Sequence, residues 1–428
     1  NREKTGPKPR DAASGFFLPQ KYCSIPVEGE IVMNDSCLSA MSVFVLSLLL
    51  LGFTQQPMSA GASSESVKRH TVGCAFPLSG RFAGEGKKAK DAVMLSARQF
   101  RARSPFSPGI VTADSGADPA MMKKAIAHLA DGENVVAIIA VSGAAEAEAA
   151  AVEAQQRRVP VILITPKEGV TKAGDQVFQH FLTPEQQAEA LADYAVNELR
   201  INVFGTLYPG DEYGEGMNRL FCADVHKNGG RVARSVAYPM AQTDFRQQIK
   251  KLVGKKDKAS RFPDARGEEE MPAELEGLFI PDSAFRARMI TAQLAFYNVR
   301  KIRIFGTSLW NTPDLLRKGN GYMEGAFFAD SFYARGLAAE TVNFADAYRA
   351  VYNREPQTME ALAYDTMRLV LNILEDPEIE TRDGFAQALL ATKDIQGATG
   401  VISFGGGRVA QKEALILKVQ DGEIVQVR

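Results

Sequence analysis

The stretch "VGCAFPLSGRFAGEGKKAKDAV", residues 72–93, decides the fold. It begins with an apolar run, passes through a loop that contains Ser79 and several glycines, and continues into a segment with helical spacing of its apolar residues. A buried strand followed by a loop and an amphipathic helix is the repeating unit of α/β proteins. The stretch therefore predicts the first strand, loop and helix of such a fold.

The glycines of this loop raise the question of a dinucleotide site. "GEG" at residues 84–86, with Ala89 behind it and Asp114 at the end of the next predicted strand, nearly forms a dinucleotide fingerprint. That motif needs its first glycine in the turn directly after the strand, whereas about six residues separate Pro77 from the first glycine here. The glutamate between the glycines would also meet a pyrophosphate with like charge. A nicotinamide enzyme stays an outlying alternative, and we expect no cofactor.

The same pattern repeats from His70 to the end of the chain. We predict strands at 71–77, 109–114, 135–140, 159–165, 202–208, 231–238, 275–281, 301–307 and 414–420. Helical segments lie between them, and the segment 183–200 begins with a capping box of Thr183 and Gln186. Alternating strands and helices predict parallel sheets. Because so many units exceed one ordinary open sheet, the sequence predicts an α/β protein of two Rossmann-like, doubly wound lobes.

Two segments do not fit this pattern. "SVFVLSLLLLGF" (42–53), followed by Ala60-Gly61-Ala62, has the length and cleavage site of a secretory signal, so we set residues 1–62 aside as a leader that is not part of the fold. Export to the periplasm is expected, without stable membrane insertion after processing; a lipoprotein is less favoured because Cys74 lies far beyond the apolar run. The charged segment 254–274 is expected to be a surface insertion.

Composition excludes several functions. The 428 residues are 45% hydrophobic, and 50 basic residues against 51 acidic ones give no basic surface for nucleic acid. The four histidines are scattered, no nucleophile motif is present, and no cluster has metal-ligand spacing. We therefore expect neither catalytic residues nor a metal, and interpret the protein as non-enzymatic. The cysteines Cys74 and Cys222 are interpreted as buried free thiols rather than a bridge.

Ligands of doubly wound sheets bind beyond the carboxyl ends of the strands, so the loops after the predicted strands hold the candidate site. The candidate ligand-binding residues are Ser79, Ser142, Gly143, Ala144, Thr165, Lys167, Tyr208, Tyr213, Asp282, Ser308 and Trp310. The loop "YPGDEYGEGM" (208–217) lacks the lysine of a phosphate loop and the spacing of a calcium loop, so its tyrosines are the groups that would meet a ligand.

Several of these residues have a structural alternative. Ser142 begins a helix whose free N–H groups would suit an anion, or it simply caps that helix. Lys167 binds ligand or faces water, and Asp282 or its neighbour Ser283 caps the next helix. Trp310, the single tryptophan, stacks on a ligand or packs within its lobe.

Together these segments resemble the type I periplasmic solute-binding proteins, particularly the leucine/isoleucine/valine-binding receptors. The resemblance rests on residues 72–93, "VPVILITP", "YGEGM", "ALAYDTMRLVL" and "GATGVISFGGGRV". It implies two lobes joined by three hinge crossovers and closing on a small-molecule ligand, with lobe 1 at 70–181 plus 332–400 and lobe 2 at 182–331 plus 401–428. It also implies delivery of that ligand to the membrane permease of an ABC transporter.

The chain departs from the amino-acid receptors at three positions. The loop "VSGAAE" keeps only Ser142 of the hydroxyls that meet a ligand carboxylate there, Ser308 replaces the acidic residue that meets the ammonium, and Ser283 replaces a tyrosine. Thr165 and Tyr213 match. An unpaired ammonium in a closed site is costly, so these departures argue against a leucine-type ligand and for another small polar or amphipathic molecule.

A second branch of the same fold provides an alternative function. "LEGLFIPDS", "AQLAFYNVRKIRIFGTSLWN" and "YMEGAFFADSFY" resemble the activators of penicillin-binding proteins. That resemblance implies a regulator whose partner is a peptidoglycan synthase rather than a permease.

Overall fold

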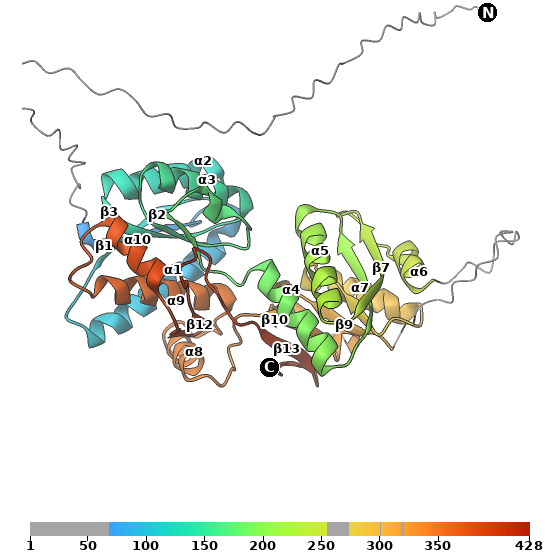
Figure 1. Ribbon diagram of the computed structural model, residues 1–428. Coiled ribbons are helices and arrows are strands. Elements are labelled where there is room, and N and C mark those ends of the chain that lie inside the picture. The colour runs from blue at the N-terminus through green and yellow to red at the C-terminus, as the bar shows by residue number, and fades with distance from the viewer. Residues whose placement is uncertain (1–67, 255–273, 300, 318–320) are drawn as a thin grey trace, which may run out of the picture. The chain divides into compact units, whose positions relative to one another are not determined.

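The computed structural model describes residues 68–254, 274–299, 301–317 and 321–428 (Figure 1). The predicted leader at 1–62 and nearly all of the predicted insertion at 254–274 lie outside these residues. In the described part of the chain, no helix combines the length and the apolar character that crossing a membrane requires.

The first sheet has five parallel strands in the order β2-β1-β3-β4-β5. Every residue of β3 and β4 is buried, as expected for parallel strands covered on both faces. The strands are β1 (Lys68–Phe76), β2 (Gly109–Asp114), β3 (Val135–Val141), β4 (Val161–Ile164) and β5 (Val177–Gln179).

The second sheet repeats this order and extends it. Its parallel part runs β7-β6-β8-β9-β10; β13 pairs antiparallel with β10, and β14 pairs antiparallel with β13. The strands are β6 (Val203–Pro209), β7 (Arg231–Tyr238), β8 (Gly277–Phe279), β9 (Arg303–Gly306), β10 (Phe327–Asp330), β13 (Leu415–Gln420) and β14 (Glu423–Gln426). In both sheets the first strand along the chain therefore lies between the second and the third.

The chain passes between the two sheets three times: after β5, after β10, and between the small β11–β12 hairpin (Ile395–Gly397 and Gly400–Ile402) and β13. On its return after β10 it forms α8, α9 and α10, drawn orange to red beside the blue α1 in Figure 1, and α9 packs along α1. The helices are α1 (Ala83–Arg103), α2 (Pro119–Ala127), α3 (Ala144–Gln156), α4 (Pro184–Asp193), α5 (Glu212–Lys227), α6 (Arg246–Val253), α7 (Ala284–Phe296), α8 (Ala339–Tyr352), α9 (Thr358–Leu374) and α10 (Arg382–Ala391). This arrangement confirms the predicted fold class; the exact lobe boundaries stay predictions.

All nine predicted strands are present, and the capping box of Thr183 and Gln186 is formed in both directions at the start of α4. The helix predicted over 183–200 ends its α-helical part at Asp193 and continues as one wider turn over Tyr194–Glu198. The predictions missed the short β5, as well as β10, β14 and the β11–β12 hairpin.

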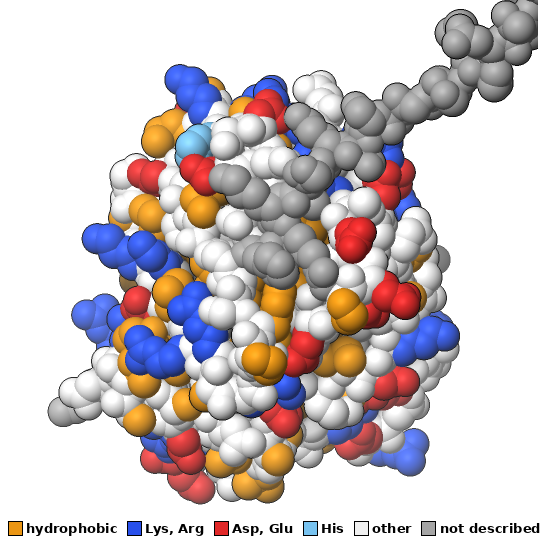
Figure 2. All heavy atoms as spheres, turned by 90° about the vertical axis from the view of Figure 1, so that its left-hand side faces the viewer, with side chains coloured by type: hydrophobic (Ala, Val, Ile, Leu, Met, Phe, Trp, Pro, Cys, Tyr) orange, Lys and Arg blue, Asp and Glu red, His pale blue; other side chains and the backbone are white. Residues whose placement is uncertain are grey.

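Apolar side chains cover both faces of each sheet. In β1, Val72, Cys74 and Phe76 belong to one core and Ala75 to the core on the other face, as the alternation of a strand requires. Cys74 and Cys222 are both free, and burial raises the pKa of the Cys74 thiol to about 12. On the face drawn in Figure 2, acidic and basic side chains are interspersed, in keeping with the balanced composition.

One glycine near the start of α1 and one near the start of α5 have a steric purpose. A Cβ added to Gly86 would lie 2.0 Å from the carbonyl oxygen of Pro77, and one added to Gly214 would lie 2.2 Å from that of Pro209. Each glycine therefore allows α1 or α5 to approach the end of the strand that precedes it. This close approach, rather than phosphate binding, accounts for Gly86 and Gly214, whereas a Cβ added to Gly84 or Gly216 would meet no atom within 4 Å.

Candidate functional site

The strand order places the candidate site. In open α/β sheets ligands bind where the connections from neighbouring strands run in opposite directions, and this strand order places that point between β1 and β3 in the first sheet and between β6 and β8 in the second. Each of the eleven candidate residues follows or ends one of the strands β1, β3, β4, β6, β8 and β9. The parallel topology thus brings them to the carboxyl-end edges of the two sheets, as predicted.

After β1, Ser79 is exposed and held by Asp114, the last residue of β2. The backbone N–H groups of Leu78 and Ser79 donate to Asp114 Oδ1 at 2.8 and 3.2 Å. Slight burial alone would raise the pKa of Asp114, but the bonds from Ser79, Gly116 and Leu78 outweigh it and lower the pKa. The aspartate that the dinucleotide alternative would have assigned to a ribose therefore fixes the loop itself.

After β3, Ser142 does not cap the helix that follows. Gly143 is the N-cap residue of α3, and no side chain caps it. The Ser142 hydroxyl oxygen is buried and has no hydrogen-bond partner in the described part of the chain. Of the two alternatives left open by the sequence, the cap is therefore wrong, and a role for Ser142 in ligand binding stays a prediction.

The start of α3 already has a negative group beside it. The side chain of Glu146 is buried and folds back, so that a Cβ on Gly143 would lie 2.8 Å from its Oε2 atom. A carboxylate there interacts favourably with the positive end of the helix dipole. This internal charge disfavours a second carboxylate, from a ligand, at the same helix start.

After β4, Thr165 and Lys167 have different environments. Thr165 is fully buried, and its hydroxyl accepts the backbone N–H of Lys167 at 3.3 Å. Lys167 Nζ lies 3.0 Å from Glu212 in the first turn of α5 and 3.2 Å from Glu148 of α3. The hydrogen bonds to Glu212 and then Glu148 raise the pKa of Lys167. This lysine therefore joins the strand-end edge of the first sheet to that of the second.

After β6, Tyr208 is half-buried at the end of the strand, and Tyr213 lies in the first turn of α5. Asp211 caps this helix by accepting the N–H of Gly214 at 2.8 Å. The Tyr213 hydroxyl donates to Thr307 Oγ1 at 3.1 Å, and burial raises its pKa to about 12. Tyr213 is thus protonated at neutral pH and directed toward the loop after β9.

After β8, Asp282 belongs to a buried polar group. Its Oδ2 accepts the Tyr238 hydroxyl at 2.7 Å and lies 3.7 Å from Arg286 Nε. Burial, followed by the bond to Asp282, raises the pKa of Tyr238. Ser283, not Asp282, caps α7.

After β9, Trp310 is fully buried and its indole N–H donates to the carbonyl oxygen of Asp282 at 2.9 Å. Its ring covers Gly306, where a Cβ would lie 2.2 Å from the ring. This position favours packing within the lobe, one of the two roles left open for Trp310. The N–H of Ser308 donates to Gln187 of α4 at 3.0 Å, and its side chain is half-buried.

Three polar residues of these loops were missed by sequence reasoning: Glu146, Tyr238 and Thr307. Tyr238 and Thr307 directly follow the apolar core of a predicted strand, so their position was a usable signal. Glu146 lies one turn into an alanine-rich helix, and no pattern distinguishes it from the exposed Glu148.

No group of three or more His, Cys, Asp or Glu side chains in the described ranges is placed to hold a metal ion.

Residues 70–423 match the model of a family described as periplasmic binding protein, which covers most of the chain.

The chain belongs to the periplasmic binding protein family.

Solved structures of periplasmic binding proteins share its fold. It is similar to a putative branched-chain amino acid ABC transporter from Rhodospirillum rubrum, with 21% identity, a TM-score of 0.72 and coverage of 83% of this chain and 99% of that one. It is also similar to the substrate-binding protein LivJ from Streptococcus pneumoniae in complex with isoleucine, with 22% identity, a TM-score of 0.64 and coverage of 85% of this chain and 100% of that one. A third is a solute-binding protein of an ABC transporter from Rhodopseudomonas palustris in complex with 3,4-dihydroxybenzoic acid. The two share 22% identity with a TM-score of 0.66, over 83% of this chain and 95% of that one. No protein of curated function matched the sequence.

Proposed function

We propose that this periplasmic binding protein is exported, does no catalysis, and binds a small polar or amphipathic molecule between the strand-end loops of its two lobes for delivery to an ABC-type permease. The single observation that carries the proposal is the contact of Lys167 with Glu212, because it joins the carboxyl-end edges of the two sheets, where ligands of this topology bind. The relatives in complex with isoleucine and with 3,4-dihydroxybenzoic acid support a small-molecule ligand. No observation favours the regulator of peptidoglycan synthesis.

The hydrogen-bonding groups of the loops suggest the kind of ligand. The Tyr213 hydroxyl donates its hydrogen bond to Thr307, so the Tyr213 oxygen can only accept any further hydrogen bond. The Ser142 hydroxyl is free, and the Glu146 carboxylate lies beside the start of α3. These three groups can all accept a hydrogen bond, which favours a ligand that presents hydroxyl or amine groups toward them.

A thermal-shift screen of the full chain tests this function. The probes are amino acids, aromatic acids with and without ring hydroxyls, small carboxylates and muropeptides. A ligand that binds the native state raises the unfolding midpoint, by an amount that grows with the logarithm of its concentration over Kd. We expect a hydroxyl- or amine-bearing probe to do so, and Tyr213→Ala to weaken its binding by about 1 to 3 kcal/mol through lost stacking and hydrogen bonding.

Tyr322→Ala is the matched control, since Tyr322 is an exposed tyrosine outside these loops. It should leave the affinity unchanged. The proposal fails if no probe shifts the midpoint, or if Tyr213→Ala binds the active probe as tightly as the unaltered protein.

A further inference from the structure

A second recess lies away from the strand-end loops. It has a volume of about 290 Å³ and lies between α10, the residues just before β5, and Arg408. Phe178, Ala386 and Leu390 give it an apolar floor, and the remaining lining is polar. This volume is just below the usual range for small-molecule sites, about 300 to 1,000 Å³, so only a small molecule fits.

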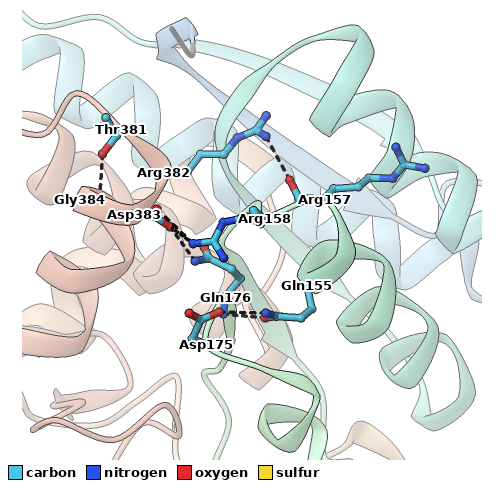
Figure 3. A network of polar contacts seen from close by, with 9 residues as sticks. All are labelled: Gln155, Arg157, Arg158, Asp175, Gln176, Thr381, Arg382, Asp383 and Gly384. Carbon is cyan, nitrogen blue, oxygen red and sulfur yellow. Dashed lines mark hydrogen bonds and ion pairs between the residues drawn. The ribbon is translucent and has the colours of Figure 1, made fainter. Parts of the chain in front are cut away.

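Arg158, Asp383 and Asp175, three of the charged side chains that line this recess, already have hydrogen-bond partners within the protein. Arg158 donates two hydrogen bonds to the carboxylate of Asp383, at 3.0 and 3.2 Å. Asp175 accepts a bond from Gln155 at 2.9 Å. Figure 3 shows these side chains close together between the start of α10 and the residues just before β5. These side chains therefore shape the recess, and the groups that would bind a ligand must come from other residues.

Gln176 supplies an acceptor with no donor. Its side chain is 2% exposed, and its Nε2 donates to Asp383 Oδ1 at 3.0 Å. Because a carboxylate can only accept, this bond fixes which end of the amide is nitrogen. The other end, Oε1, is buried and has no partner among the described residues. A buried acceptor in this state is rare, and a ligand that donates to it would satisfy it.

Arg408 supplies a donor with no acceptor. Its Nε is buried without a hydrogen-bond partner in the described part of the chain, while Nη2 makes a long bond of 3.4 Å to the carbonyl oxygen of Thr171. The Nε and Nη atoms of a guanidinium form a fork that fits the two oxygens of a carboxylate. The two unpartnered groups of the recess thus call for opposite functions on one ligand.

We infer that this recess is a second ligand site, which takes a small carboxylic acid that also carries a hydroxyl or amine. The carboxylate pairs with Arg408, the hydroxyl or amine donates to Gln176 Oε1, and a short carbon skeleton lies on the apolar floor. The site does not depend on the proposed function of the strand-end loops. It lies beside the crossovers, since the carbonyl oxygen of Arg408 accepts the N–H of Gln179, the last residue of β5, at 2.8 Å.

Isothermal titration of the full chain with glycolate, glycine and acetate tests the site. Glycolate and glycine carry both functions, whereas acetate lacks the donor. Arg408→Gln should weaken all three by about tenfold or more, because it removes a charge-assisted pair. Gln176→Met should weaken glycolate and glycine by several-fold and leave acetate unchanged, because acetate has nothing to donate to Oε1.

Two controls keep the result specific. Arg98→Gln removes an exposed arginine of α1 in the same lobe and should leave all three affinities unchanged. Tyr213→Ala, which tests the strand-end loops, should leave unchanged the part of the binding that Arg408→Gln weakens, so failure of one site does not imply failure of the other. If Arg408→Gln does not fold, Arg408→Lys keeps the charge without the fork and should still weaken binding. The inference is overturned if none of the three acids binds saturably, or if they bind and the Arg408 and Gln176 variants match the unaltered protein.

Discussion

The carboxyl group of Asp330 should make the stability of this protein fall as the pH rises through the mildly acidic range. Asp330 ends β10, where the chain leaves the second sheet, and its side chain is 1% exposed. Its Oδ2 accepts bonds from Asn311 Nδ2 and Thr358 Oγ1, both at 2.7 Å. Burial raises its pKa from 3.8 to about 6, because these bonds only partly offset the loss of water.

The sign and size follow from proton linkage. Between pH 4 and pH 6 the native carboxyl still holds its proton, whereas the unfolded chain has released it, so the native state binds more protons and loses stability as the pH rises. The rise in pKa covers about two units, each worth about 1.4 kcal/mol. The contribution of Asp330 to the free energy of unfolding should therefore be present below pH 4 and fall by about 3 kcal/mol by pH 7.

The assay is urea unfolding of the full chain at fixed pH values from 4 to 7, beside the Asp330→Asn variant. Asparagine does not titrate, so the difference in unfolding free energy between the two proteins isolates this group. Thr358→Val removes a donor to the ionised form and should move the fall to higher pH. A difference that stays level from pH 4 to pH 7, or that grows with pH, would refute the reasoning.

Two further predictions concern packing and a second buried charge. Gly214→Ala should destabilise the protein by at least about 1 to 3 kcal/mol, because the added Cβ would meet the carbonyl oxygen of Pro209. Chemical unfolding measures the effect, with Gly216→Ala as the control because the space around Gly216 is open. Lys412 is buried, and its Nζ donates to Thr399 Oγ1 at 2.7 Å. Burial lowers its pKa to about 8, although the negative charge of Asp365 acts to raise it. Between pH 8 and pH 10.5 the unfolded chain still holds this proton and the native state has released it, so the native state gains stability as the pH rises. The free energy of unfolding of the unaltered protein, measured relative to that of Lys412→Met, should therefore rise by about 3 kcal/mol over this range. A difference that does not rise with pH contradicts the assignment.

The architecture was predictable because its signals are local. Apolar runs alternate with capped helices, and the capping box of Thr183 and Gln186 forms as expected. The strands that were missed have weak signals for physical reasons. β5 has three residues, and β10 lies in the aromatic-rich stretch "GAFFADSFY", where a short buried strand has no polar alternation.

The edge on which the candidate site lies was also predictable, but the state of each side chain was not. Parallel topology requires that residues after the strands share one edge. It does not say whether Trp310 points out from that edge or back into the core, where the structure places it. Nor does it say that Ser142 leaves the capping position to Gly143, since both residues are acceptable N-caps.

The two sites proposed for this protein differ in polarity, and that difference makes them separable. The strand-end loops present the Tyr213 oxygen, the Ser142 hydroxyl and the Glu146 carboxylate, so a ligand gains most there by donating hydrogen bonds. The second recess presents the guanidinium of Arg408, so a ligand gains most there by bringing a carboxylate. A hydroxyl-rich neutral molecule should therefore favour the first site and a small carboxylic acid the second. Because burying an unpaired charge or polar group is costly at either site, exchanging the two ligands should weaken binding at both.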